Sequence, residues 1–477
     1  MQLRFFGATG GTTGSCHALS FGDRTVLFDC GLYQGRRQES YERNARFAFD
    51  PKSVDAVLQS HAHIDHSGKL PMLARHGFRG AIHATPATRD LARVLLYDCA
   101  KILESDAEHL NRRRAEEHAG RGPRRGDLLP QADLEPLYVR EDVDTALTRF
   151  RPHAYGEWFD VVPGLRARFH DAGHILGSAW VEAEAIEGGR TTRIVFTGDY
   201  GRRAQPILRD PEPLVPCDVL ITETTYGNRS HPSAQEGTEG LYEAVRRLAQ
   251  RGRGRLLIPA FAVGRTQNLL YLLARGVHAG AIPPVRVVVD SPLATQATQV
   301  VADHPDLYDP EALAEFRRYE AEPAFRTRLS FTSSVEESKA LNRDPRPCVV
   351  IAASGMCETG RILHHLAWHL ESTDTEILIV GFQAEHTLGR RLQEGTSPVR
   401  IFGRACEVRA RVTPMLGFSA HADREGLLEA LTPLAPGDPR VFLVHGEDDA
   451  RRPFEVELRR RGFTRVEAPS DSRAWTI

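Results

Sequence analysis

Short apolar runs bounded by Gly, Pro or Asp dominate the first part of the chain. Such runs are typical of β-strands, and they occur in LRFFG, TVLFDC, VDAVLQS, AIHAT, RARFHDA, AWVEAEAI and RIVFTGDY. A helical pattern follows Pro86, with apolar residues at Leu91, Val94, Leu95, Ile102 and Leu103. Residues 104–135 contain RRRAEEHAGRGPRRGD, a charged stretch rich in Gly and Arg that predicts a loop.

The pattern changes at about residue 206. Near-continuous apolar strands now alternate with helix-like segments, in CDVLITETT, RLLIPAF, VRVVVDS, CVVIAASG and EILIVGF. This alternation indicates βα units around a mostly parallel sheet that is buried on both faces. After about residue 397 the β-rich style returns in VRIFGRACEVRARV, followed by a helix near 424–434 and the strand RVFLVHGE. We therefore expect an α/β protein in which residues 206–397 are inserted into a domain built from 1–205 and 398–477.

Composition narrows the class of protein without defining it. The 477 residues suggest at least two domains, and the net charge of −2 means that any nucleic-acid-binding surface must be local. The N-terminus lacks the apolar core of a signal peptide, and the longest apolar runs are too short to span a bilayer. Seven scattered cysteines without a CxxC pair predict reduced thiols. A cytoplasmic protein with no membrane partner is expected.

The stretch HAHIDHSG, residues 61–68, follows an apolar strand. It contains His61, His63, Asp65 and His66 within six positions. Imidazole and carboxylate side chains together suit zinc or a similar metal, and a strand end is a rigid base for ligands. The alternative is a solvated polar loop, which would not require this spacing.

Three further candidates also stand at the ends of apolar strands: His174 in DAGHILGS, Asp199 in RIVFTGDY and His445 in RVFLVHGE. Each alone is weak, but their shared position favours assembly with the histidine cluster. Three His per metal and a bridging Asp would leave a place for water on a two-metal site, which lowers the pKa of that water. Asp29, in VLFDCG, also ends a strand and is expected to orient a ligand.

These motifs resemble those of the metallo-β-lactamase superfamily, namely HAHIDH, GHILGS, TGDY and FDCG. The inserted region adds TETTYG, PAFAVGRTQ, ASGMCETGR, GFQAEHTLGR, GFSAHAD and LVHGE, and the whole set resembles the β-CASP nucleases. That family includes RNase J and the endonuclease of eukaryotic pre-mRNA 3′-end processing. The resemblance implies an αββα sandwich with an inserted β-CASP domain. One position departs from the family, because His386 stands where a glycine is usual.

The resemblance also implies the role of each residue. His61, His63 and His174 would hold one zinc ion, Asp65, His66 and His445 the other, and Asp199 would bridge the two Zn²⁺ of each chain. Glu223 and His421 would form an acid pair that protonates the leaving oxygen, so the expected catalytic residues are Asp65, Asp199, Glu223 and His421. A histidine at position 445 resembles the RNA-cutting branch of the family. The simpler readings are a surface acid for Glu223 and a helix-capping neighbourhood for His421.

Phosphate groups need positive or N–H-rich contacts. Arg265, Arg361 and Arg390 lie in the first turns of predicted helices, where free N–H groups also attract anions, and Ser419 precedes His421. Each Arg alone could equally be a solvated helix residue. Together they predict a phosphate track in one cleft, which would reconcile RNA binding with the neutral net charge.

The sequence therefore predicts a zinc-dependent ribonuclease that hydrolyses single-stranded RNA with a metal-activated water. The alternatives are a small-molecule metallohydrolase, such as a lactonase or thioesterase, and a non-catalytic RNA-binding scaffold. Endonuclease and 5′-to-3′ exonuclease modes both stay open, as does a homodimer.

Overall fold

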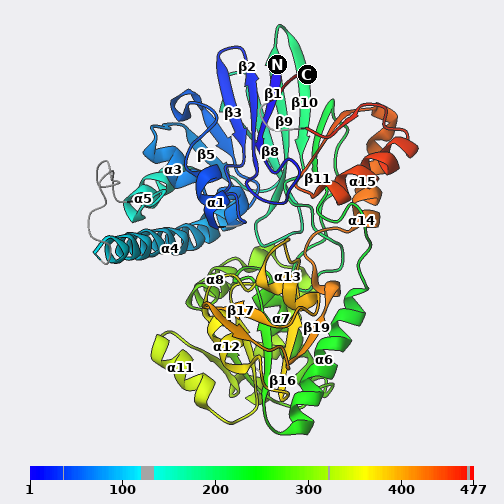
Figure 1. Cartoon of the computed structure of the whole chain (residues 1–477). Helices are drawn as coiled ribbons and strands as arrows, with labels where there is room; N and C mark the ends of the chain where they lie inside the picture. Colours follow the sequence, from blue (N-terminus) through cyan, green and yellow to red (C-terminus); the bar gives the residue numbers. More distant parts are fainter. Residues whose placement is uncertain (36, 120–133, 321–322, 470–472) are drawn as a thin grey trace.

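The computed structural model describes residues 1–35, 37–119, 134–320, 323–469 and 473–477. Two units are stacked on each other, one formed by both ends of the chain and the other by its middle (Figure 1). The N- and C-termini lie side by side because the last strand pairs with the first. The middle of the chain is thus inserted into the terminal unit, as the return of the β-rich pattern predicts.

The terminal unit contains two seven-stranded sheets. The first sheet has the order β22 (Ala474–Thr476), β1 (Gln2–Gly7), β2 (Cys16–Phe21), β3 (Arg24–Phe28), β4 (Ala56–Leu58), β5 (Ala81–Ala84) and β6 (Phe150–Pro152). The second has the order β21 (Val466–Glu467), β20 (Arg440–Val444), β11 (Val219–Glu223), β10 (Arg190–Phe196), β9 (Ala179–Glu187), β8 (Leu165–Asp171) and β7 (Trp158–Val162).

The two sheets pack face to face over an aromatic and aliphatic core. Phe5 and Phe28 of the first sheet meet Phe196 and Phe442 of the second, and all four side chains are buried. Helices cover the outer faces of the sandwich: α1 (Arg37–Asn44), α2 (Ile64–Ser67), α3 (Leu70–Arg75), α4 (Pro86–Ala119) and α5 (Arg140–Leu147) beside the first sheet, α14 (Arg424–Leu431) and α15 (Asp448–Arg460) beside the second. The unit is the expected αββα sandwich.

The inserted unit is built on one parallel six-stranded sheet. Its order is β14 (Leu329–Phe331), β13 (Arg286–Val289), β15 (Cys348–Ala352), β12 (Arg255–Pro259), β16 (Thr375–Ile379) and β19 (Arg411–Pro414). The central strands β12, β15 and β16 are buried along their whole length, which explains their near-continuous apolar sequences. A short hairpin, β17 (Val399–Ile401) and β18 (Arg404–Cys406), lies beside this sheet.

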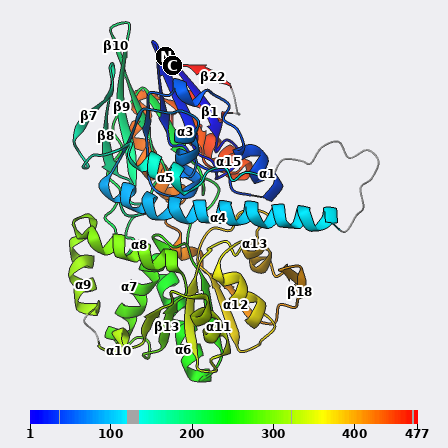
Figure 2. The same cartoon turned by 90° about the vertical axis from the view of Figure 1, so that its left-hand side faces the viewer.

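Helices surround the inserted sheet on both sides. They are α6 (Ala234–Arg251), α7 (Arg265–His278), α8 (Pro292–Asp303), α9 (Pro310–Glu320), α10 (Pro323–Arg326), α11 (Val335–Arg343), α12 (Arg361–His369) and α13 (Leu388–Gln393). The long helix α4 lies between the two units, where it packs against α8 (Figure 2). The inserted unit therefore sits as a cap on the sandwich.

The chain passes between the two units at other positions than those expected from the sequence. β11 extends the sandwich sheet, although it lies within the expected insert of residues 206–397. β17, β18 and β19 belong to the cap, although they lie within residues 398–477, which are expected in the sandwich. Each difference has its own physical reason: β11 is as apolar as a cap strand, whereas residues 399–414 alternate between apolar and polar positions like sandwich strands.

The charged stretch at 104–135 also differs from expectation. Residues 104–119 continue helix α4, and the rest of the expected loop lies largely outside the described residues. All seven cysteines are free in the structure. Within the described parts of the chain, no helix combines the length and apolarity needed to cross a membrane.

Candidate active site

The candidate residues meet at the edge of the sandwich that faces the cap. β10, β11 and β20 are parallel neighbours, so their carboxyl ends place Asp199, Glu223 and His445 at the same edge. The histidine cluster follows β4 of the opposite sheet and leads into α2, and His174 follows β8. The loops that follow these strands of the two sheets therefore meet at one point.

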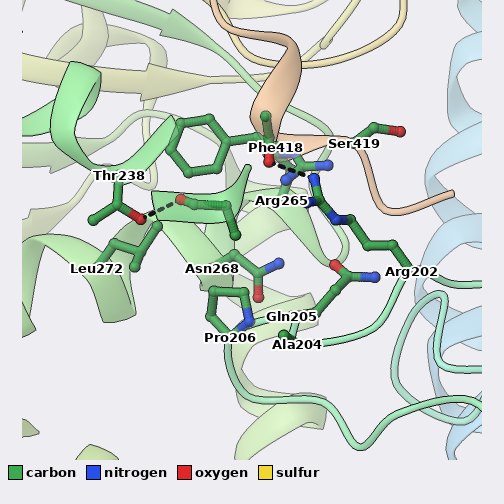
Figure 3. Close-up of a pocket in the computed structure, with 12 residues that line it drawn as sticks. Arg202, Ala204, Gln205, Pro206, Thr238, Arg265, Asn268, Leu272, Phe418 and Ser419 are labelled. Atoms are coloured by element: carbon green, nitrogen blue, oxygen red, sulfur yellow. Dashed lines mark hydrogen bonds between the residues drawn. The ribbon is translucent and has the colours of Figure 1, made fainter. Parts of the chain in front are cut away.

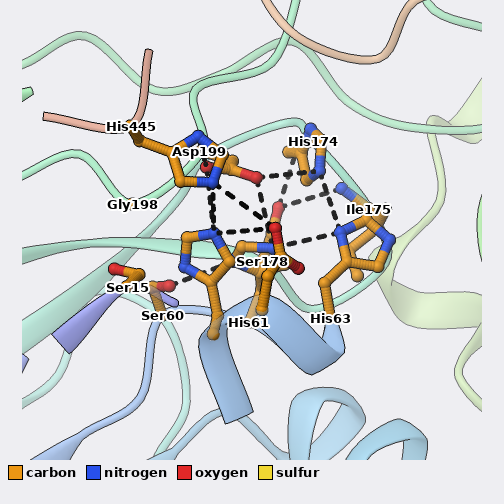
Figure 4. A network of polar contacts seen from close by, with 12 residues as sticks. Ser15, Ser60, His61, His63, His174, Ile175, Ser178, Gly198, Asp199 and His445 are labelled. Atoms are coloured by element: carbon orange, nitrogen blue, oxygen red, sulfur yellow. Dashed lines mark hydrogen bonds and ion pairs between the residues drawn. The ribbon is translucent and has the colours of Figure 1, made fainter. Parts of the chain in front are cut away.

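The first cluster contains three imidazoles and one carboxylate (Figure 4). His63 Nδ1 lies 3.1 Å from His61 Nε2 and 3.3 Å from His174 Nε2. Asp199 Oδ2 lies 3.4 Å from His61 Nε2 and 3.5 Å from His174 Nε2. Four ligand atoms from three separate loops thus surround a single point.

The second cluster lies on the other side of Asp199. His66 Nε2 is 3.1 Å from His445 Nε2, and Asp65 Oδ2 is 3.5 Å from the same His445 atom. Asp199 Oδ1 faces this cluster, 3.2 Å from His66 Nε2 and 3.3 Å from His445 Nδ1. The two oxygens of Asp199 therefore point to different clusters.

The spacing of these atoms fits metal ions. Two nitrogens bound to one tetrahedral zinc ion at about 2.0–2.1 Å lie roughly 3.3 Å apart, close to the separations in the first cluster. Asp199 Oδ1 is buried and accepts no hydrogen bond, although two ring nitrogens are close to it. A buried carboxylate oxygen without a donor is costly, and a cation shared with the ring nitrogens would satisfy it.

The protonation of the first cluster also suits a cation. Burial lowers the pKa of His61 to about 3 and that of His63 to about 4, and it holds the pKa of His174 well below its usual value. The three imidazoles are therefore neutral near pH 7, and each keeps a lone pair for a metal. Burial opposes ionisation of Asp199, yet the surrounding histidines hold the pKa of this carboxyl well below its usual range.

Residues behind the clusters fix the orientation of the rings. Asp29 is fully buried, and its Oδ2 lies 2.7 Å from His66 Nδ1 and accepts from Ser60 Oγ at 2.8 Å. Ser60 Oγ also lies 3.0 Å from His61 Nδ1. Thr225 Oγ1 lies 3.1 Å from His445 Nδ1. The sequence analysis did not identify Ser60 or Thr225 as site residues. Their positions offered a signal, because Ser60 directly precedes His61 and Thr225 lies two residues after Glu223.

Glu223 and His421 form a third group beside the clusters. Both Glu223 oxygens lie 3.1 Å from His421 Nδ1, and the carboxylate also accepts from the Tyr200 N–H at 2.6 Å. His421 Nδ1 is 4.0 Å from Asp199 Oδ2. Burial disfavours a charge on His421, but Glu223 and Asp199 raise its pKa to about 9. The pair is therefore placed to hold a proton next to the clusters.

Arg265 and Ser419 lie together beside this group, around a small cavity (Figure 3). Arg265 is the first residue of α7, its Nε is buried without a partner, and no described carboxylate forms an ion pair with it. Burial lowers its pKa to about 10, so the guanidinium stays charged near pH 7. Arg202 lines the same cavity and donates to the Gly417 carbonyl at 2.7 Å.

The other two arginines of the expected phosphate track are engaged elsewhere. Arg361 donates to Asp290 at 2.6 Å and to the carbonyl of Ser333 at 3.1 Å, so its guanidinium is part of a polar network inside the cap. Arg390 donates to Glu394 at 2.6 Å on an exposed helix face. Arg361 therefore does not fit a phosphate-binding role, and Arg390 would have to release its carboxylate partner.

His386 occupies a strained backbone position. Its φ of 68° lies in the left-handed region, and its side chain is exposed. Glycine adopts this conformation without steric cost, which explains in physical terms why glycine suits this position. The imidazole is absent from all three potential ligand clusters found among the described residues.

Together the sandwich, the paired clusters at its edge and the cap define a metal-dependent hydrolase of the metallo-β-lactamase fold. Family models match in the same order: the metallo-β-lactamase superfamily over residues 9–151, the Beta-Casp domain over 266–392, and the Zn-dependent metallo-hydrolase RNA specificity domain over 406–469. The chain belongs to the β-CASP family of this superfamily.

Several known proteins are similar in sequence over nearly the whole length of this chain. Ribonuclease TTHA0252 of Thermus thermophilus is 38% identical over 472 residues, covering 97% of this chain and 99% of the relative. The transcription termination factor FttA of Methanosarcina mazei is 30% identical, covering 91% of this chain and 65% of the factor. FttA of Methanocaldococcus jannaschii is 28% identical, with 96% and 69% coverage.

Among solved structures, a protein of unknown function from Enterococcus faecalis V583 covers 100% of this chain and 99% of its own, with a TM-score of 0.51. At 12% sequence identity this likeness shows the fold alone.

Proposed function

We propose that the protein is a zinc-dependent ribonuclease that hydrolyses phosphodiester bonds of single-stranded RNA. The observation that carries the proposal is the placement of the Glu223–His421 pair beside two adjacent ligand clusters, which face the two oxygens of Asp199. The similarity to a named ribonuclease over nearly the whole chain supports RNA as the substrate.

In this proposal His61, His63 and His174 would hold one zinc ion, Asp65, His66 and His445 would hold a second, and Asp199, which faces both clusters, would serve both ions. When bound, the metals would lower the pKa of water and stabilise charge on the phosphate. Asp29 holds the His66 ring in place through its 2.7 Å contact. His421 gives its Nε2 proton to the leaving oxygen, while Glu223 at Nδ1 stabilises the charged ring.

The rival functions leave parts of this arrangement without a role. A lactonase or thioesterase needs only the metal clusters. In such an enzyme the cap and the Glu223–His421 pair would have no role. A non-catalytic RNA-binding scaffold has no need for seven convergent ligands, all of which are present in this chain.

A comparison of substrates tests the proposed function. Purified protein loaded with zinc is incubated with labelled single-stranded RNA, single-stranded DNA of the same sequence, and a thioester. We expect cleavage of RNA well above that of DNA and no turnover of the thioester. Equal cleavage of both nucleic acids would reject the RNA assignment, and turnover of the thioester alone would favour a small-molecule hydrolase.

The environment of Arg265 leads to a prediction about RNA affinity. Arg265→Met removes a buried cation that pairs with no carboxylate of the described residues, so RNA binding should weaken by roughly tenfold. The plot of log affinity against log salt concentration should become shallower, with its negative slope smaller in magnitude by about 0.7, because one phosphate contact is lost. Filter binding over a salt series measures both quantities.

Arg361→Met and Arg390→Met are the matched controls for this experiment. Both arginines already bond carboxylates, so their salt slopes should stay at the parental value. A slope that is equal in Arg265→Met and in the parent would exclude a phosphate contact at Arg265.

A further inference from the structure

A second, larger pocket lies on the sandwich unit, outside the candidate active site. It has a volume of about 360 Å³, within the range of roughly 300–1,000 Å³ that is typical of small-molecule sites. Its walls come from the glycine-rich segment 6–16, from residues 31 and 33, from residues 43–49, and from Lys69. We call it the Lys69 pocket.

The walls of the Lys69 pocket are joined directly to the proposed metal ligands. The His445 N–H donates to the carbonyl of the lining residue Ala8 at 2.7 Å, and the N–H of Ser15, which lies between the lining residues Gly14 and Cys16, donates to the Asp65 carbonyl at 2.8 Å. Gly31 packs so tightly on this backbone that a Cβ there would lie 1.7 Å from the Asp65 carbonyl oxygen. The pocket therefore adjoins the cluster of Asp65, His66 and His445.

Lys69 is a buried cation in the wall of the pocket. Only 9% of its surface is exposed, and its ammonium donates to the Arg46 carbonyl at 3.3 Å and lies 4.4 Å from the centre of the Phe47 ring. No carboxylate among the described residues forms an ion pair with it, and burial lowers its pKa. Neither a carbonyl nor an aromatic ring offsets the cost of burying a full charge, whereas an anion in the pocket would.

The other lining residues fit a nucleotide. Four aromatic side chains line the pocket, contributed by Phe6, Tyr33, Phe47 and Phe49, and aromatic rings stack with bases of any sequence. Arg43 is exposed, lies over the Tyr33 ring at 4.3 Å and pairs with Glu39. Lys69 is buried and forms no such pair with any described residue. Gly11 leaves room at the wall, since a Cβ there would meet no atom within 4 Å.

We propose that the Lys69 pocket binds one nucleotide of single-stranded RNA that flanks the scissile phosphate, with its phosphate on Lys69 and its base against the aromatic wall. This inference rests on the proposed ribonuclease function and adds to it a substrate subsite that is separate from Arg265. The subsite would hold the strand on the sandwich side while the cap holds it on the other.

Binding of a short RNA to chelator-treated protein tests the inference apart from cleavage. The probe is a fluorescein-labelled single-stranded RNA of eight nucleotides. Lys69→Met should weaken binding by roughly tenfold and reduce the salt slope by about 0.7, because one phosphate contact is lost. Gly11→Trp should weaken binding similarly by filling the pocket while Lys69 stays in place. Lys52→Met, at an exposed lysine of the same unit, is the matched control and should bind like the parent.

The outcomes separate this inference from the proposed function. If the parent binds RNA and both pocket variants bind equally well with the parental salt slope, the inference is overturned and the function stands. If Lys69→Met misfolds, as judged by its thermal unfolding, Gly11→Trp decides alone, and parental affinity in that variant overturns the inference. If the parent binds no RNA at any salt concentration, the inference is overturned, and cleavage of single-stranded RNA by the zinc-loaded parent decides the proposed function separately.

Discussion

His63→Ala is expected to abolish RNA cleavage and to reduce the bound zinc. His63 Nδ1 stands between His61 and His174, 3.1 and 3.3 Å from their ring nitrogens, and is central to the first cluster. A methyl group offers no lone pair, so the remaining residues would hold a cation weakly and the nucleophilic water would lose its activation. The zinc content, measured by elemental analysis, and the rate of cleavage of labelled RNA should therefore fall together.

The matched control is His109→Ala, at an exposed histidine on helix α4. This variant should keep the parental zinc content and rate. A His63→Ala protein that cleaves RNA at the parental rate would exclude the first cluster from the reaction, whatever its metal content.

His421→Ala should slow RNA cleavage by about 10²–10⁴-fold while the zinc content stays parental. The reason is geometric, because His421 contacts Glu223 at 3.1 Å, whereas its nearest contact with Asp199 is 4.0 Å. The variant would thus lose a proton donor and keep the metal ligands. On bis(p-nitrophenyl) phosphate, whose leaving group needs no proton, the deficit should be much smaller.

Glu223→Gln provides the companion test of the pair. An unpaired imidazole holds its proton less well, so this variant should resemble His421→Ala, and the double variant should be little slower than either single one. If His421→Ala instead loses zinc, or slows the activated substrate as severely as RNA, His421 would be a metal ligand and not an acid.

The sequence was most informative where function depends on strand ends. The spacing in HAHIDHSG and the position of Asp199 and His445 after apolar strands predicted one site, and the structure brings these side chains together. The position of such residues can be predicted from the sequence because a strand end fixes the direction of the next side chain. The split of the Asp199 oxygens between two clusters needs coordinates, since spacing says nothing of side-chain rotation.

Tertiary pairing explains what the sequence could not predict. β11 looks like a cap strand but pairs with β10 and β20, and β19 looks like a sandwich strand but pairs with β16. Arg361 opens a helix as expected, yet Asp290, more than 70 residues away in sequence, takes its guanidinium. The sequence did not point to Lys69, because the burial of this side chain appears only in the fold.

Zinc titration of chelator-treated protein tests the central claim most directly, with cleavage of single-stranded RNA and bound metal measured in the same samples. We predict that chelation removes the activity and that zinc restores it, reaching a plateau at about two ions per chain. Cleavage that persists at the full rate in protein without bound metal would contradict the account.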